Sequence, residues 1–325
     1  MRLLAVLLNW RTPDMTLRAA EAALRAMEGI AGALTIVDND SGDGSWERLS
    51  AGLAQRAWAP DRVRLLQSGR NGGFGAGNNQ GIRAGLPDGG RPDLVYILNS
   101  DAFPDSDAIR ALVAHLAAHP RCGLAGSRIQ GEGGEPHLTT FRFPSALSEL
   151  EGAARLGLLS RLLRDRAVPV PVPEATRRVD WLAGASLMIR QEVLDRVGLF
   201  DEGFFLYFEE TDLCLRAARA GWETHWVRES VVTHIGSVST GMKRWERTPE
   251  YWFDSRLRYF RKNGRPALAT AAHVAGGLLH RARRGLAGRR AIDPPGTLRR
   301  LISHHLAHAF RTPDAQPRAR LSEQT

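Results

Sequence analysis

The sequence predicts an α/β protein: a mainly parallel sheet flanked by helices and followed by a basic helical appendage. Its first third alternates short apolar runs with amphipathic segments, which is the pattern of parallel strands joined by crossover helices. With 43% hydrophobic and 24% charged residues, the composition is that of a globular protein. The 325 residues suffice for one large α/β domain or for a domain with an appendage.

The appendage is inferred from where the charge lies. Residues 261–325 hold 13 of the 44 Lys and Arg residues but 3 of the 35 Asp and Glu residues, so this segment has a charge of +10 and residues 1–260 have −1. An Arg-rich end beside apolar stretches favours an anionic membrane surface, whereas nucleic-acid binding needs the charge spread over a folded face. The near-neutral body therefore disfavours nucleic acid as a partner.

Five apolar runs predict the first strands, and the amphipathic segments between them predict helices. The strands are expected at Leu3–Leu8, Ala33–Val37, Val63–Leu66, Leu94–Leu98 and Leu124–Ile129. The helices are expected at Pro13–Met27, Ser45–Arg56, Gly75–Ala84 and Ser106–His119. Residues 130–178 break the alternation with Gly- and Pro-rich stretches, which predict an insertion or flexible loop.

Regular structure is expected to resume after this insertion. The predicted elements are a strand at Trp181–Ile189, a helix from Gln191, a helix over Glu209–Ala220, short strands at Trp222–Val227 and Ser230–His234, and a helix over Thr248–Lys262. Gly221 is the expected end of the helix that starts at Glu209.

Cysteine and apolar content indicate the compartment. Cys122 and Cys214 are too few and too far apart for a disulfide framework or a cysteine-based zinc site, so a reducing cytosol is expected. Leu3–Leu8 lacks a following cleavage site and is expected to be a strand, not a signal peptide. No uncharged apolar run approaches the ~20 residues of a spanning helix, so membrane contact is expected to be peripheral.

Polar residues follow four predicted strands, at Asn9, Asp38–Ser45, Gly69–Phe74 and Asn99–Asp101. Each group alone is explained by a turn or a helix cap. Ligands of parallel α/β sheets bind at the carboxyl ends of the strands, so four groups at one edge predict a binding site. Gly72–Asn79 opens a helix but matches neither common nucleotide-loop motif, which disfavours kinase-like and dinucleotide-binding functions.

Two more features suggest chemistry. A short carboxylate at a strand end, Asp101, suits Mg²⁺ or Mn²⁺, with a helix N-cap as the alternative. Glu209, Glu210 and Asp212 lie in a first helical turn, where the helix dipole stabilises negative charge. The aromatic loop before them, Asp201–Tyr207, is of the kind that holds a sugar ring and gives a general base a dry setting.

Six segments, in this order, resemble the inverting glycosyltransferase family 2 in its bacterial branch of rhamnosyltransferases and galactofuranosyltransferases. The resemblance covers about residues 3–240, through Val37–Ser45, Asn71–Gly81, Leu98–Asp101, Trp181–Ala185, Gly198–Glu202 and Phe208–Arg216. It implies a GT-A, Rossmann-like fold, a nucleotide-diphosphate sugar donor, a cofactor Mg²⁺ or Mn²⁺, and a single displacement that inverts the anomeric carbon.

The resemblance also implies roles for individual residues. Asp101 matches the metal-binding Asp of an Asp-x-Asp motif whose first position here is Asn99, and His234 matches a histidine that completes the metal site in some members. Glu210 takes the place of the catalytic base, usually an Asp, and Asp212 is the alternative base or its orienting partner. The donor nucleotide would be bound by Asn9, Asp38, Asn39, Arg70, Asn71, Asn79 and Ser100, and the acceptor by Trp181, Gly184, Ala185, Tyr207 and Glu209.

The predicted domains are residues 1–264 for the GT-A domain and 265–325 for the basic tail. Within the first, residues 1–129 form the nucleotide-sugar-binding half and 179–240 the acceptor and catalytic half. Apolar stretches beside the tail arginines predict an anchor at the cytoplasmic face of the membrane, near a lipid-linked glycan acceptor. A solvated helical appendage and an oligomer contact are the alternatives.

The resemblance favours dTDP-rhamnose as the donor, with UDP-hexose or UDP-galactofuranose as the alternative. A different class of function is also considered: a non-catalytic subunit that binds a sugar nucleotide or a glycan. Two departures from the family pattern, Asn99 and Glu210, support that class.

Overall fold

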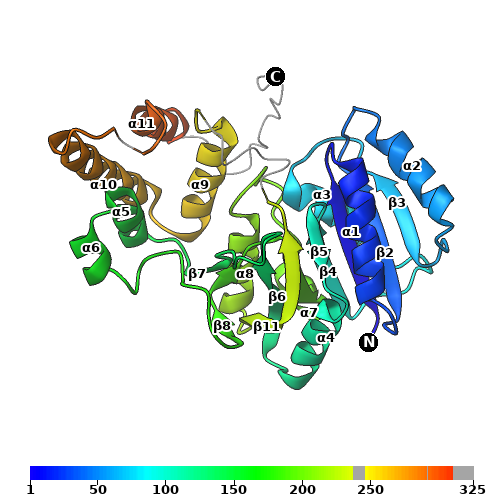
Figure 1. The fold of residues 1–325 in the computed structure, drawn as a ribbon. Helices are drawn as coiled ribbons and strands as arrows, with labels where there is room; N and C mark the ends of the chain where they lie inside the picture. Colours follow the sequence, from blue (N-terminus) through cyan, green and yellow to red (C-terminus); the bar gives the residue numbers. More distant parts are fainter. Residues whose placement is uncertain (237–245, 291, 310–325) are drawn as a thin grey trace.

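The computed structural model describes residues 1–236, 246–290 and 292–309, and shows an α/β body with a helical unit at one end (Figure 1). The main sheet has the strand order β3-β2-β1-β4-β10-β6-β11-β5, and β8 pairs with β11. Its strands are β1 (Leu3–Asn9), β2 (Gly32–Asp38), β3 (Val63–Gln67), β4 (Leu94–Asn99), β5 (Ala102–Pro104), β6 (Cys122–Gln130), β8 (Arg177–Val179), β10 (Ser186–Arg190) and β11 (Glu223–His234). A small second sheet pairs β7 (Thr140–Phe141) with β9 (Trp181–Leu182).

The register of the central strands brings their carboxyl ends to one edge. β1 runs parallel to both β2 and β4, with Asn9 opposite Asp38 and Leu8 opposite Asn99. β10 is antiparallel to β4 and to β6, so β6 and its parallel partner β11 run in the same direction as β1. The mainly parallel sheet predicted from the sequence is confirmed, and the end of β11 at His234 joins the same edge.

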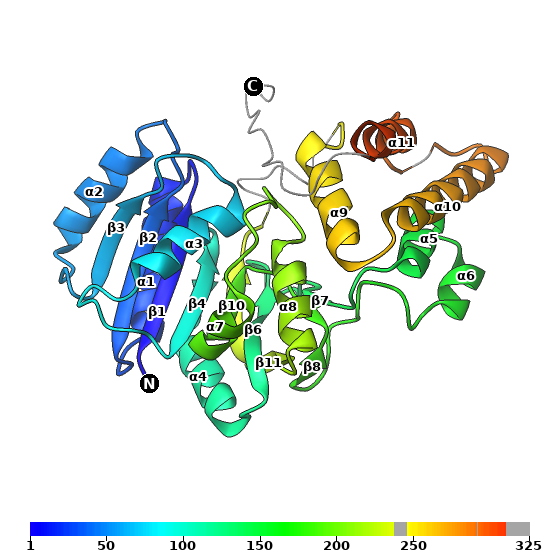
Figure 2. The same cartoon turned by 180° about the vertical axis from the view of Figure 1, so that it is seen from behind.

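Apolar cores lie on both faces of the sheet because side chains alternate along each strand. In β1, Leu3, Ala5 and Leu7 point into one core, and Leu4 and Val6 into the other. The first core is covered by α1 (Pro13–Ala26), α2 (Ser45–Arg56) and α4 (Ala108–Ala118). The second is covered by α3 (Phe74–Ala84), α7 (Gln191–Val197) and α8 (Glu209–Arg219), on the face seen in Figure 2.

The structure corrects three sequence predictions. The flexible loop expected over residues 130–178 is wrong, because this segment forms β7, β8, α5 (Ala146–Ala154) and α6 (Gly157–Leu162). The single strand expected at Trp181–Ile189 is split into β9 and β10 at residues 183–185. The two short strands expected within residues 222–234 form one strand, β11, with an irregularity between Val227 and Val231.

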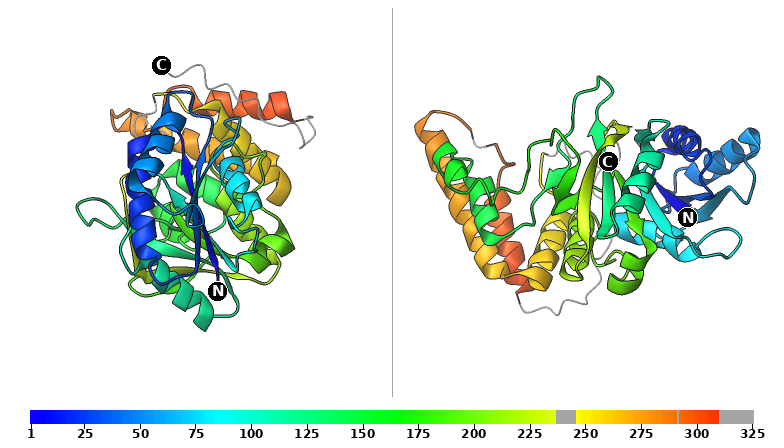
Figure 3. Two further views of the ribbon diagram at one scale, coloured as in Figure 1. Left: turned by 90° about the vertical axis from the view of Figure 1, so that its right-hand side faces the viewer. Right: turned by 90° about the horizontal axis from the view of Figure 1, so that it is seen from below.

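The helical unit includes more of the chain than the basic tail predicted from the sequence. It consists of α5, α6, α10 (Pro266–Leu286) and α11 (Thr297–His308), packed on α9 (Glu250–Asn263), and is called the appendage from here on. Figure 3 shows α5 alongside α10. The Arg256 guanidinium of α9, 1% exposed, donates from Nε and Nη2 to Glu149 Oε2 of α5 at 2.9 and 2.7 Å. His273 Nδ1 of α10 lies 2.8 Å from the same oxygen. A buried ionic contact therefore ties the appendage to the body.

The predicted tail falls partly outside the described residues, since 291 and 310–325 are not described. No helix in the described ranges is both long and apolar enough to cross a membrane.

Candidate active site

The ends of β1 and β2 form one hydrogen-bonded unit around Asp38, which is 1% exposed. Asn9 Nδ2 donates to Asp38 Oδ1 at 2.7 Å, and Ser41 Oγ donates to the same oxygen at 2.5 Å. Thr16 Oγ1, from α1, donates to Asn9 Oδ1 at 2.7 Å, which fixes the orientation of the Asn9 amide. Asp38 Oδ2 receives only a long contact, 3.4 Å from the Ser41 N–H, within the described residues.

The loop after β3 is drawn to the same place. Asn39 Nδ2 donates to Asn71 Oδ1 at 3.0 Å, and that oxygen also accepts the Gly73 N–H at 3.0 Å. Gly73 is required here: its φ is +88°, and an added Cβ would lie 1.9 Å from the Phe205 carbonyl oxygen. The side chain of Arg70 is exposed, and its Nη2 lies 3.6 Å from Glu202 Oε2. The structure thus brings Asn39, Asn71 and Arg70 beside the loop that precedes α8.

Asn79 and Ser100 have different surroundings. Asn79 is fully buried and links α3 to the segment before α8: its Nδ2 donates to the Phe200 carbonyl at 2.9 Å and to Glu202 Oε1 at 3.0 Å. Its Oδ1 accepts the Phe200 N–H at 3.1 Å, so the whole amide is occupied. Ser100 Oγ accepts from Thr12 Oγ1 at 3.0 Å, at the strand-end edge. The contacts of the Asn79 amide therefore lie within the protein, and Glu202 links Asn79 to Arg70.

Asp101 and His234 meet where β4 and β11 end. Asp101 is 4% exposed, and its Oδ1 lies 3.0 Å from His234 Nε2. Its Oδ2 accepts the Gly236 N–H at 3.1 Å, and Asn99 Nδ2 lies 3.4 Å from the His234 ring nitrogen. The Asp101 carboxylate offers the oxygen ligands that Mn²⁺ and Mg²⁺ prefer, and the His234 nitrogen is a second potential ligand for a transition metal such as Mn²⁺. The residues present fit a divalent metal.

The start of α8 places two carboxyl groups inside the protein. Tyr207 and Phe208 precede it with φ of +70° and +71°, a left-handed turn that non-glycine residues rarely adopt and that is found at functional sites. Glu210 Oε1 accepts the Gly184 N–H at 3.4 Å. Glu210 Oε2 and Glu209 Oε2 are buried without a hydrogen-bond partner among the described residues.

Burial of these two groups changes their protonation. Removal from water raises the pKa of Glu210, because burial disfavours the charged carboxylate. The pKa of Glu209 is raised well above its ordinary value, first by burial and then by the adjacent charge of Glu210. Buried, unpaired carboxyl groups with raised pKa values are typical of catalytic acids and bases.

Asp212, two residues on, is also buried but is fully paired. Arg216 Nε donates to its Oδ2 at 2.7 Å, and Lys262 Nζ lies 2.8 Å from its Oδ1. Asn263 Nδ2 adds a contact at 3.3 Å to the same Oδ1. Asp212 therefore joins α8 to α9, and its oxygens have less capacity to accept a proton from a ligand than Glu210 has.

Residues 183–185, between β9 and β10, link the end of β4, where Asn99 lies next to Asp101, to the Glu210 carboxyl group. The Asn99 N–H donates to the Ala185 carbonyl at 3.1 Å, while Gly184 donates to Glu210. Trp181 stacks on Phe141, with ring centroids 4.2 Å apart, and its Nε1 donates to the Arg142 carbonyl at 2.9 Å. The indole is thus fixed beside the 183–185 segment. Tyr207, another of the predicted acceptor residues, lies next to Tyr251, with the two ring centroids 6.3 Å apart.

Two residues that orient predicted site residues were not identified from the sequence. Thr16 in α1 donates to Asn9, and Thr12, the residue before α1, donates to Ser100. A local motif does not indicate these contacts, because each depends on how a later helix or loop packs.

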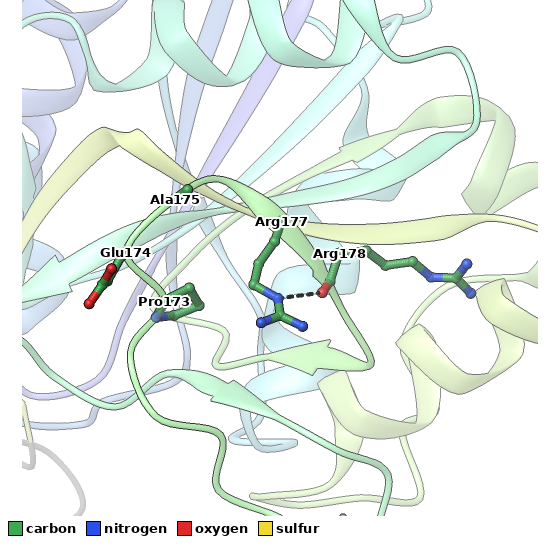
Figure 4. A pocket seen from close by; sticks show the side chains of 5 residues that line it. All are labelled: Pro173, Glu174, Ala175, Arg177 and Arg178. Atoms are coloured by element: carbon green, nitrogen blue, oxygen red, sulfur yellow. Dashed lines mark hydrogen bonds between the residues drawn. The ribbon is translucent and has the colours of Figure 1, made fainter.

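An open hollow lies elsewhere, beside β8, and is lined by Pro173, Glu174, Ala175, Arg177 and Arg178 (Figure 4). Arg177 Nε donates to the Arg178 carbonyl at 3.4 Å. β8 pairs with Thr224–Trp226, near the opposite end of β11 from His234. None of the predicted site residues lines this hollow.

The sheet with acidic groups at its carboxyl edge is the GT-A fold of glycosyltransferases. The fold matches GalNAc-T7, solved with UDP, GalNAc and Mn²⁺, with a TM-score of 0.55 and 13% identity over 94% of this chain and 58% of that one. It also matches the mannosyltransferase PcManGT from Pyrobaculum calidifontis, solved with GDP-Man and Mn²⁺, with a TM-score of 0.52 and 13% identity over 95% and 75% of the two chains.

Residues 9–263 match the glycosyltransferase like family 2, and the chain belongs to this family. It is 31% identical over 220 residues to an N-acetylglucosaminyl-diphospho-decaprenol L-rhamnosyltransferase of Mycobacterium tuberculosis, covering 63% of this chain and 67% of the relative. It is 28% identical to rhamnosyltransferase WbbL of Escherichia coli, covering 48% and 58%. The predicted family and enzyme class are confirmed: the protein is a glycosyltransferase with rhamnosyltransferase relatives.

Proposed function

We propose that this enzyme transfers rhamnose from dTDP-rhamnose to a hydroxyl of a lipid-linked glycan, with inversion at the anomeric carbon. The observation that carries the proposal is the buried Glu210 carboxyl, whose Oε2 lacks a partner among the described residues and which shares the 183–185 segment with Asn99 at the strand ends. The names of the relatives support the sugar, and the acidic edge supports a nucleotide-sugar donor.

The nucleobase would lie against Asp38. Asn9 and Ser41 occupy Asp38 Oδ1, so Oδ2 is available to accept the N3–H of a thymine or uracil ring. The Asn39 and Asn71 amides hold the neighbouring loop closed around this position. A site that hydrogen-bonds a polar edge rejects bases that lack the matching group, because its own polar atoms are then left unpaired.

Asp101 and His234 would hold a divalent metal, Mg²⁺ or Mn²⁺. When bound there, the metal offsets the negative charge that develops on the diphosphate leaving group. Asn99 would orient His234 through its 3.4 Å contact with the ring nitrogen.

Glu210 is the proposed general base. The acceptor hydroxyl oxygen attacks the anomeric carbon from the side opposite the diphosphate, the bond from that carbon to the diphosphate oxygen breaks, and the hydroxyl proton passes to Glu210. The Gly184 N–H holds one carboxylate oxygen and leaves the other to receive the proton. Because burial raises its pKa, the ionised carboxylate is a stronger base than an exposed glutamate.

A donor screen tests the assignment. With Mn²⁺ present, dTDP-rhamnose is expected to raise the thermal midpoint more than UDP-glucose or UDP-galactofuranose, because a ligand that binds the folded state stabilises it. dTDP, UDP and GDP alone separate the nucleobase from the sugar. A larger shift with a UDP-hexose would replace the donor while leaving the enzyme class intact.

We also propose that the appendage contacts an anionic membrane surface, where a lipid-linked acceptor would be found. Most of the large apolar side chains that are exposed in the described residues belong to it or, for Ile292, to the segment between α10 and α11: Leu147, Leu158, Leu162, Leu268, Leu278, Leu279, Leu286, Ile292, Ile302 and Leu306. Arg281, Arg283 and Arg284 of α10 supply positive charge beside them. Apolar and basic side chains together bind anionic interfaces.

Truncation at residue 264 is a poor test of membrane binding, because α10 covers Arg256 and α5. Replacement of Leu158, Leu162 and Leu286 by Gln keeps this packing and is expected to reduce sedimentation with phosphatidylglycerol vesicles several-fold. Leu138→Gln, at an exposed leucine outside the appendage, is the control. Unchanged vesicle binding would refute the membrane role, and loss of a dimer instead would assign the surface to self-association.

A further inference from the structure

Three side chains with metal-binding atoms converge at the edge of the sheet opposite the candidate active site. His115 lies in the last turn of α4, Cys122 is the first residue of β6, and His225 lies near the start of β11 (Figure 1). One ligand atom from each lies within 4.8 Å of the other two. The proposed transferase mechanism uses none of these residues.

A hydrogen bond joins the two histidines, and a metal ion bound by both rings would take the place of its proton. His115 Nε2 lies 2.9 Å from His225 Nδ1, so two ring nitrogens face one another. The other nitrogen of His225, Nε2, lies 3.1 Å from Glu223 Oε2. A carboxylate on the far ring nitrogen is the usual partner of a metal-ligating histidine, because it fixes the tautomer and leaves the near nitrogen free to ligate.

Glu223 is itself held in place. Arg121 and Arg178 lie 3.1 and 3.6 Å from its Oε1, which leaves Oε2 directed at His225. The cluster thus has potential ligands and an outer carboxylate whose orientation two arginines support.

Cys122 is fully buried, and its thiol donates to the Leu124 carbonyl at 3.2 Å. A metal ion bound at the cluster would displace the thiol proton, because a coordinating thiol is deprotonated.

We propose that His115, Cys122 and His225 bind one Zn²⁺ ion, with water at the fourth tetrahedral position. Thiolate and imidazole ligands select Zn²⁺, whereas the Asp101 and His234 pair suits a harder cation. The ion would join α4 to β6 and β11, and so stabilise the strand whose other end carries His234. A single cysteine is enough here because the fold supplies two histidines from separate elements.

A second cluster, Asp254, His304 and His308, lies between α9 and α11 and lacks sulfur. His304 Nε2 is 2.7 Å from Asp254 Oδ1, an ordinary hydrogen-bonded pair. The absence of a thiolate allows a spectroscopic test to distinguish the two clusters.

Co²⁺ titration of the reduced, metal-stripped full-length protein tests the proposal. The expected result is a thiolate-to-cobalt charge-transfer band in the near ultraviolet that is complete when one equivalent of Co²⁺ occupies this site and that Zn²⁺ displaces. Cys122→Ser and His115→Gln are expected to lose this band and the increase in thermal midpoint that Zn²⁺ causes. Cys214→Ser, at an equally buried cysteine on the opposite face of the sheet, is expected to keep both.

Further variants separate this site from the other two. The double variant D101N/H234Q and the variant His304→Gln are expected to keep the charge-transfer band. A cobalt spectrum without thiolate character, or binding abolished by either of these variants, would overturn the proposal. If Cys122→Ser does not fold, His115→Gln decides, because this histidine is partly exposed and its loss leaves no cavity in the core.

Discussion

Glu210 and Asp212 lie two residues apart in the first turn of α8, yet their surroundings are opposite. Asp212 is paired with Arg216 and Lys262 and contacts Asn263. Glu210 has one long hydrogen bond from Gly184, and its second oxygen is buried without a partner among the described residues. Both carboxyl groups are removed from water, but one is fully neutralised by its neighbours.

The difference separates a structural charge from a functional one. A buried carboxylate without a cation costs stability, so a fold retains it where a reaction requires it. A buried carboxylate whose oxygens are all occupied holds helices together. The sequence places the two groups in one acidic segment and does not distinguish them.

The largest expected effect is on turnover in Glu210→Gln. A general base contributes about 100- to 10,000-fold to the rate, so turnover is expected to fall by that range while donor affinity is retained. Steady-state rates and donor titration by calorimetry measure the two. Glu192→Gln, at an exposed glutamate of α7, is the matched control. Full activity in Glu210→Gln would assign the base elsewhere.

Asp212→Asn is expected to show the opposite pattern. It leaves Arg216 and Lys262 facing a neutral amide and should lower the free energy of unfolding by about 3 kcal/mol. Denaturant titration gives this value, and the turnover of the folded fraction should stay within a few-fold of the parent. Asp165→Asn, at a highly exposed aspartate, is the control. A collapse of turnover as deep as in Glu210→Gln would exchange the two roles.

A smaller effect is expected on the pH dependence of stability. The pKa values of Glu209 and Glu210 are raised in the folded state, so their protonated forms stabilise the fold below the ordinary carboxyl pKa. This contribution is lost as pH rises through the raised pKa values. The double variant E209Q/E210Q should therefore gain stability over the parent as pH rises to neutrality, by about 2–4 °C in thermal midpoint for each kcal/mol regained. A constant difference between pH 4 and pH 8 would contradict the assigned shifts.

The smallest expected effect concerns the hydrogen bond from Gly184 that positions Glu210. In Gly184→Ala, the added Cβ would lie 3.0 Å from Phe74 Cζ and 3.8 Å from Glu210 Oε1. A displacement of a few tenths of an ångström should lower turnover several-fold, because a 1 Å error costs about 100-fold. Gly152→Ala, with open space around it in α5, should leave turnover unchanged. Equal effects of the two changes would remove Gly184 from the positioning of Glu210.

The first half of the fold could be predicted from the sequence because its strands are short, apolar and bounded by polar turns. β1 and α2 have the expected starting residues, and the strand ends meet at Asn9 and Asp38. The segment over residues 130–178 could not be predicted as ordered, because α5 is stabilised by α10, more than 100 residues later.

The candidate site was predictable in its residue types and less so in their surroundings. The family resemblance assigns Asp101 and His234 to one metal site, and the structure places the two side chains 3.0 Å apart. The sequence did not indicate that Asn79 is fully occupied by Phe200 and Glu202, or that Lys262 neutralises Asp212. These contacts depend on packing between elements that are distant along the chain.

Arg256 and Glu149 have a consequence for how the appendage can be exchanged between related enzymes. Because α5 lies in one part of the chain and α10 in another, the appendage is built from two separate segments of the sequence. A chimera that replaces residues 265–325 alone would bury the arginine of one protein against the unmatched helix of another. An exchange that keeps α10 against its own α5 must carry residues 144–167 as well, so two separate segments of the chain must be replaced together.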